Sequence, residues 1–230
     1  MNQNKTGKYI KYAIGEIVLV VIGILIALSI NNWNEAQKEK LKAITILEAI
    51  RSDMLDDLED MARYKTPWER HIMYFKRVFP SFNPNDEIPP FADIDAMSQV
   101  SYKTLFNYMA PFRYSTSAFD GMISNGNSDL ITNDTLFSNI QEFYTFNVPT
   151  NENLFEILRQ QSSDLNYKYA HIITYRPYKN ISDLTDEYLI ADLNIFFQSK
   201  NFYYSRTFVK NKKDLTDIIS QIDKELKNTK

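Results

Sequence analysis

The chain lacks cysteine and contains few glycines and histidines. With no cysteine among its 230 residues, disulfide bonds, thiolate nucleophiles and cysteine-based metal sites are excluded. Only two of the five glycines, Gly121 and Gly126, lie beyond residue 30. This scarcity argues against an all-β fold, which needs many tight turns. The two histidines, His71 and His171, are far apart in the sequence, and neither suggests a metal site.

Common motifs of catalytic and nucleotide-binding sites are also missing. The sequence has no glycine-rich phosphate loop, no G-x-S-x-G and no H-E-x-x-H. Acidic residues are abundant, but nothing in the sequence positions a catalytic pair of them. We therefore expect a protein that is not an enzyme and that needs no metal or other cofactor. A hydrolase with carboxylate chemistry is the weaker alternative.

One long apolar run dominates the N-terminal part of the chain. Residues 13–30 read AIGEIVLVVIGILIALSI and hold a single charge, Glu16. A membrane-spanning helix needs about 20 mostly apolar residues. Aromatic residues favour the two membrane interfaces, and the expected interfacial anchors are Tyr9, Tyr12 and Trp33. The sequence thus predicts a basic tail at 1–12, a transmembrane helix at 13–33 and a helical exported domain at 34–230.

Two other interpretations of the run, and its orientation, are open to test. A buried core helix would need protein on all its sides. A cleaved signal peptide would suit the small-x-small triplet that ends at Ser29. Lys5, Lys8 and Lys11 precede the run without any acid, which favours a cytoplasmic N-terminus. The expected location is the bacterial inner membrane, with the C-terminal domain in the periplasm.

Two features within the run predict contacts in the membrane. Gly15, Gly23 and Ala27 are spaced by eight and four residues, so they lie near one helix face and form a candidate helix–helix contact; the alternative is that small residues are simply common there. Glu16 is a candidate functional intramembrane acid. Alternatively, its carboxylate reaches the headgroups or pairs with Lys8 or Lys11.

The remainder of the chain is mildly acidic and has helical periodicity. Removing the three tail lysines changes the formal charge from −3 to −6, which argues against a nucleic-acid partner. Apolar residues recur at three and four over 35–64, and no proline or glycine separates this helix from the membrane segment. We expect the acids of this helix to form a solvated face: Asp53, Asp56, Asp57, Glu59 and Asp60. Pro67 suits the first turn of a second helix.

Further helices are expected along the exported domain. Local signals predict a helix over 117–124, a turn at Asn125-Gly126 and a helix capped near Asn133 or Asp134. Other helices are expected over 68–79, 96–108, 151–173 and 184–198, the last capped by Asp183. A final amphipathic helix from about Tyr204 is expected to pack along 35–64.

Two segments of the chain carry a resemblance to a known family: the opening KYIKYAIGEIVLVVIGILIALSINNWNE and the central AFDGMISNGNSDLITNDTLFSNIQEFY. They resemble a family of single-pass membrane proteins of unknown function from flavobacteria and other Bacteroidota. The resemblance is strongest in the opening segment and looser in the central one. It implies an inner-membrane anchor and a helical domain, and it carries no catalytic residue.

The sequence as a whole predicts an all-α protein, with a transmembrane helix followed by a helical bundle. The function we expect is interaction or scaffolding in the envelope. The expected partners are the membrane and either a homo-oligomer or another envelope protein. The alternative is an exported ligand-binding or sensory module. An early glutamate in an apolar helix also suggests a pilin-like subunit, but Glu16 lies too far downstream of Gly7.

Overall fold

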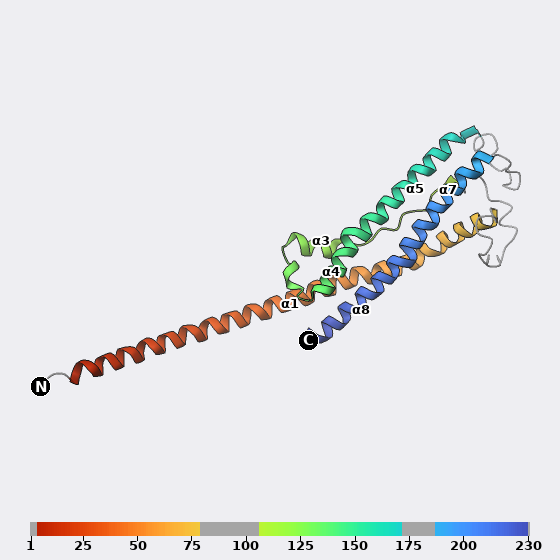
Figure 1. Ribbon diagram of the computed structural model, residues 1–230. Coiled ribbons are helices and arrows are strands. Elements are labelled where there is room, and N and C mark those ends of the chain that lie inside the picture. The colour runs from red at the N-terminus through yellow and green to blue at the C-terminus, as the bar shows by residue number, and fades with distance from the viewer. Residues whose placement is uncertain (1–3, 79–105, 172–186, 230) are drawn as a thin grey trace.

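The computed structural model describes the backbone of residues 4–78, 106–171 and 187–229, and side chains within these ranges from residue 14 to 72, 106 to 171 and 187 to 228. The described residues form helices and connecting segments, without strands. Three long helical rods pack side by side, and one of them continues far beyond the others (Figure 1). The expected all-α class, with an apolar N-terminal helix followed by a helical bundle, is confirmed.

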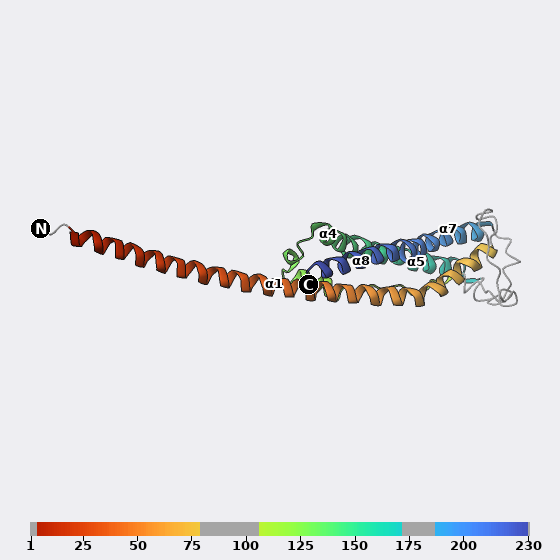
Figure 2. The ribbon, with the colours of Figure 1, turned by 90° about the horizontal axis from the view of Figure 1, so that it is seen from below.

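The extended rod is the helix α1, Asn4–Val78, which spans 75 residues. It contains the apolar run, and the side chains described between residues 14 and 42 are exposed. From Leu47 onward one face of α1 is buried in the bundle. The expected break at Pro67 is wrong: Pro67 lies inside α1, and the helix bends towards α7 near this end (Figure 2). A proline removes one backbone hydrogen bond and bends a helix without necessarily ending it.

The other two rods each join two α-helices through a π-helical segment. The second rod comprises α4 (Asp134–Glu142), η4 (Phe143–Asn147) and α5 (Val148–Lys168). The third comprises α7 (Glu187–Tyr204), η6 (Ser205–Asn211) and α8 (Lys212–Thr229). The π-helical segments were not expected from the sequence, which instead suggested an uninterrupted three/four spacing.

The expected packing of the C-terminal helix on α1 is confirmed. The third rod runs antiparallel to α1, and the C-terminus lies beside the middle of α1 (Figure 1). Arg51 Nε donates to Asp223 Oδ1 at 2.6 Å, while at the far end Tyr204 OH donates to Glu69 Oε1 at 2.7 Å. These two contacts lie near opposite ends of the interface and fix the register between α1 and the third rod.

The central part of the chain follows the local signals closely. The helix α3, Ser117–Ser124, has the expected bounds, and it is followed by the turn in which Gly126 takes a φ of 64°, a value that favours glycine. The short 3₁₀ helix η3, Ser128–Leu130, comes next. Asn133 caps α4 by accepting a hydrogen bond from the Leu136 N–H, as expected.

Residues 107–116 are a non-helical segment, which we call the strap. The sequence predicted a helix up to Tyr108, and at Asn107 and Tyr108 this is wrong; the rest of that expected helix, except Phe106, lies outside the described residues. The helix expected over 184–198 begins at Glu187 and continues to Tyr204 in the described part. The proposed cap at Asp183 also lies outside that part.

Aromatic side chains supply much of the core. Trp68 of α1 packs against Tyr203 with ring centroids 4.8 Å apart, and Phe112 of the strap contacts Phe208 at 6.1 Å. These large rings contribute much of the apolar surface area that is buried in the core. The largest of the fully buried apolar side chains are Trp68, Tyr203, Phe106, Phe112, Phe143, Phe196, Phe208, Ile50, Met54 and Met61.

Candidate functional site

Buried polar side chains gather around the strap. The Tyr203 hydroxyl accepts a hydrogen bond from the Phe112 N–H at 3.0 Å, and Asn151 Nδ2 donates to the Phe112 carbonyl at 3.2 Å. Thr207 Oγ1 in turn donates to Asn151 Oδ1. A non-helical segment in a core leaves backbone groups without helical partners, and each such group is costly when unsatisfied. These polar residues therefore hold the strap in place.

Two aspartates of α1, Asp53 and Asp57, bind the start of α3 and the end of the strap. For these two the expectation of a solvated face is wrong, whereas Asp56 and Glu59 are exposed as expected. Asp57 is only 2% exposed and accepts hydrogen bonds from the Ser115 N–H with both oxygens, at 3.0 and 3.2 Å. Asp53 accepts from the Ala118 N–H at 3.0 Å and thereby caps α3 from another helix. Burial raises the pKa of Asp57 to about 6, although the hydrogen bonds from Ser115 lower it.

A buried lysine lies near the far end of the bundle. Lys200 Nζ is 2.6 Å from His71 Nε2 and donates to the Asn107 carbonyl at 2.6 Å. The ammonium group also lies 4.1 Å from the centre of the Phe196 ring. Burial lowers the pKa of Lys200 well below its usual value, and burial together with the nearby Lys200 lowers the pKa of His71 to about 3. His71 is thus a buried residue of the core, 5% exposed.

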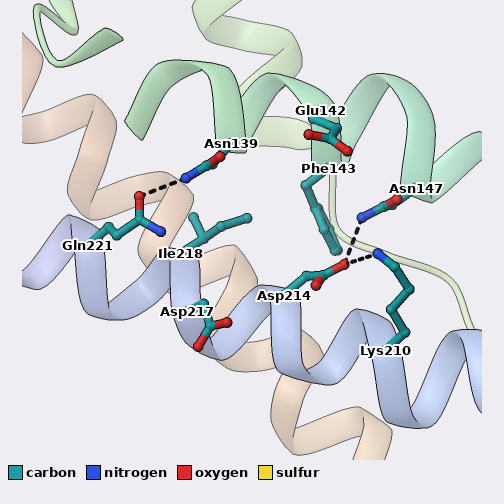
Figure 3. A pocket seen from close by; sticks show the side chains of 9 residues that line it. All are labelled: Asn139, Glu142, Phe143, Asn147, Lys210, Asp214, Asp217, Ile218 and Gln221. Atoms are coloured by element: carbon teal, nitrogen blue, oxygen red, sulfur yellow. Dashed lines mark hydrogen bonds and ion pairs between the residues drawn. The ribbon is translucent and has the colours of Figure 1, made fainter. Parts of the chain in front are cut away.

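A polar groove lies where the two π-helical segments meet. It has a volume of about 220 Å³ and is lined by Asn139, Glu142, Phe143, Asn147, Lys210, Asp214, Asp217, Ile218 and Gln221. Figure 3 shows Asp214 joined to Lys210 and Asn147, at 2.6 and 3.1 Å. Glu142 and Asp217 lie on opposite walls, one on α4 and one on α8.

The groove is a candidate for a small-ligand site in the described part of the chain. Its carboxylates suit a cationic group, but Asp214 is already paired with Lys210. Among the described residues, no cluster of three or more acids and histidines has the geometry to hold a metal ion. Sequence reasoning did not predict this groove. The one signal of it in the sequence was the pair of polar residues Asn147 and Lys210 in otherwise amphipathic helices.

The candidate residues in the apolar run lie on the part of α1 that projects beyond the bundle. Glu16 and Trp33 are exposed, while the side chains of Tyr9 and Tyr12 lie outside the described residues. At about 100° per residue, Gly23 and Ala27 lie roughly half a turn from the α1 side chains that enter the core. A side chain added at Gly15 or Gly23 would meet nothing within 4 Å. The bundle therefore leaves this face accessible.

Taken together, these features define a class: a helical bundle built directly onto a helix that is long and apolar enough to cross a membrane. Residues 16–201 match a family described as "Family of unknown function (DUF6090)", so the chain belongs to that family. No curated protein and no solved structure matches the chain.

Proposed function

We propose that this protein is a membrane-anchored interaction protein of the bacterial envelope. In this proposal, residues 13–33 span the inner membrane, the N-terminus is cytoplasmic and the bundle lies in the periplasm. The observation that carries the proposal is the continuity of α1, which passes from the apolar run into the bundle core. A continuous helix fixes the bundle's orientation relative to the membrane helix.

The uses of the buried polar residues support a binding role rather than catalysis. Tyr203, Asn151 and Asp57 each satisfy a backbone group of the strap. Residues with structural duties of this kind explain the polar interior without a reaction. The accessible small face at Gly23 and Ala27 supports contact with another membrane helix, either from a second copy or from another envelope protein.

A topology and processing experiment tests this proposal. A periplasmic phosphatase fused to the C-terminus should be active, and a cytoplasmic reporter at the same position should be inactive. The untagged protein should stay full-length in the membrane fraction. A shortened, soluble product would instead identify residues 13–30 as a signal peptide, and an inactive phosphatase would place the bundle in the cytoplasm.

Crosslinking in intact membranes then tests the interaction role. We expect a crosslinked species larger than the monomer, formed with another membrane or periplasmic protein or with a second copy. Replacing Gly23 and Ala27 with leucine should reduce the species if the small face contributes; replacing Ile22 and Ile26 with leucine provides a control of similar hydrophobicity. Recovery of monomer alone would contradict the interaction role.

A further inference from the structure

A second groove lies at the base of the bundle, where α1 enters it. Its volume is about 250 Å³, and its walls are α1 from residue 36 to 47 on one side and residues 129–132 with Glu225 on the other. We call it the basal groove. Figure 1 shows the segment between α3 and α4 and the C-terminus as the parts of the bundle nearest to the projecting part of α1. Small-molecule sites usually measure about 300–1,000 Å³, so the basal groove suits a few side chains of a protein partner.

The floor of the basal groove continues the side of α1 that forms the core. The residues on this side follow one another at alternating steps of four and three: Ala36, Lys40, Ala43, Leu47, Ile50 and Met54. This spacing keeps side chains on one face of a helix. Leu47, Ile50 and Met54 are buried, Ala43 is half-buried and Ala36 is exposed. The face that α8 and η3 contact higher up therefore extends below them into the groove.

The rim of the basal groove is acidic. Its lining includes three acids, Glu39, Asp129 and Glu225, and one lysine, Lys40, which gives a formal charge of −2. Glu225 Oε2 accepts a hydrogen bond from Asn133 Nδ2 at 2.7 Å, which holds this carboxylate at the wall. An acidic rim around a floor of alanine, isoleucine and leucine is complementary to a segment with apolar side chains on one side and basic residues at its flanks.

We propose that the basal groove binds a basic exported segment of another membrane protein, close to the point where that segment leaves the membrane. This inference rests on the proposed membrane anchor. With Trp33 at the membrane surface, the groove extends from Ala36 to Leu47, which lie 3 and 14 residues further along α1. These steps correspond to heights of about 5 and 21 Å. A helical segment of about 14 residues after a membrane span reaches the whole groove.

A second copy of α1 does not fit the basal groove. Two copies anchored in one membrane point the same way, and each α1 continues unbroken to Val78. An α1 laid along this side of its neighbour would run into the space of α8 and η3, because both pack on the same side. The basal groove lies roughly half a turn around α1 from Gly23 and Ala27, so this contact is separate from the one proposed within the membrane.

Photo-crosslinking from both walls tests the proposal. We would place p-benzoylphenylalanine at Ala36 or Thr132, both exposed, in the full chain in its native membranes. Each probe should form an adduct in which mass spectrometry finds a basic peptide of another membrane protein, within about 20 residues of its membrane span, or 30 Å of helix. The same probe at Ala49, an exposed position on another face of α1, is the matched control and should give at least fivefold less of this adduct.

A charge reversal gives a second readout. Glu39→Lys together with Asp129→Lys should lower the yield of the Ala36 adduct at least fivefold, because like charges then meet at the rim. Both residues are exposed, so the melting temperature of the bundle should change little. Asp56→Lys together with Glu59→Lys, at exposed positions higher on α1, is the control and should leave the yield unchanged. An unchanged yield after the reversal at the rim would overturn the proposal.

The other outcomes are equally decisive. An adduct with a second copy of this chain, with a soluble protein or with a lipid would overturn the proposal, as would a yield no higher than that at Ala49. The reporter fusion separates this failure from failure of the proposed function. An active periplasmic phosphatase without a groove adduct removes the contact at the basal groove alone, whereas an inactive phosphatase removes the periplasmic bundle and its partner together.

Discussion

At the scale of single residues, the buried polar side chains are explained by the hydrogen bonds that they form with backbone groups of the strap. The strap passes between helices whose own hydrogen bonds are complete, so its N–H and carbonyl groups need side-chain partners. Asp57, Asn151 and Tyr203 supply such partners from α1, α5 and α7. The same residues would look like a catalytic cluster if the strap were ignored.

Two buried residues should give the stability of the bundle opposite pH dependences. The folded pKa of Asp57, about 6, is above its ordinary value of 3.8, so its contribution to stability is full below pH 3.8 and is lost as the pH rises through 6. The folded pKa of His71, about 3, is below its ordinary value of 6.5. Its contribution is full above pH 6.5 and is lost as the pH falls towards 3.

We therefore expect a modest net change in stability between pH 7 and 4, and larger changes when one of the two groups is removed. His71→Gln should make the stability of the bundle fall less on acidification than in the unaltered chain, and Asp57→Asn should make it fall more steeply. Urea unfolding at several pH values measures the slopes. Asp56→Asn, at an exposed position on α1, is the control, and matching slopes for all three variants would contradict the assignment.

At the scale of elements, the continuity of α1 through Pro67 is the main departure from expectation. Proline costs about 3 kcal/mol in a helix interior because it lacks an N–H and clashes with the preceding turn. Tertiary contacts on both sides compensate, since Met61 and Trp68 are both buried. A local signal was thus overridden by packing.

Replacing this proline should stabilise the protein. Pro67 is exposed, so Pro67→Ala removes no core contact and restores the missing hydrogen bond. We expect a gain of about 1–3 kcal/mol in the free energy of unfolding, measured with urea. Thr66→Ala, at the exposed neighbouring position, is the control. A loss of stability would mean that the bend is needed to seat Trp68 against Tyr203.

The parts of the fold that were predictable from the sequence depend on neighbouring residues. The bounds of α3, the turn at Gly126 and the cap at Asn133 each follow from local backbone preferences. The strap and the π-helical segments depend on contacts with distant residues, such as Asn211 with Tyr114.

The candidate sites were less predictable than the fold. Asp57 was assigned to a solvated face because helical periodicity alone does not reveal which non-helical segment covers it. The groove at Glu142 and Asp217 needs two rods in register, which no local pattern specifies. The helix–helix contact expected at Gly15, Gly23 and Ala27 stays a prediction from composition and spacing.

At the scale of the whole molecule, the exposed part of α1 between the apolar run and the bundle should behave as a stiff stalk. Asn32 and Ser52 are exposed and lie 20 residues apart in one helix, which corresponds to about 30 Å. Spin labels on Asn32→Cys and Ser52→Cys should therefore report a narrow distance distribution near this value. The cysteine-free chain ensures that no other residue is labelled.

A flexible insertion provides the comparison. Two glycines inserted after Glu39 should broaden the distribution, because glycine weakens a helix. The stability of the bundle should stay within about 0.5 kcal/mol, since the stalk around Glu39 is exposed. A broad distribution in the chain without the insertion would show that the stalk already contains a hinge.

The unbroken length of α1 also acts as a ruler. From Trp33 to Val78 the helix contains 45 steps, about 68 Å at 1.5 Å per residue. For a bundle anchored at Trp33 and standing upright, the distal ends of α1 and α5 lie at that height above the lipid. In that arrangement, a partner with a short exported part would reach only the membrane-proximal part of the bundle, near α3 and the end of α8. The height of a partner above the membrane would then decide which part of the bundle it can contact.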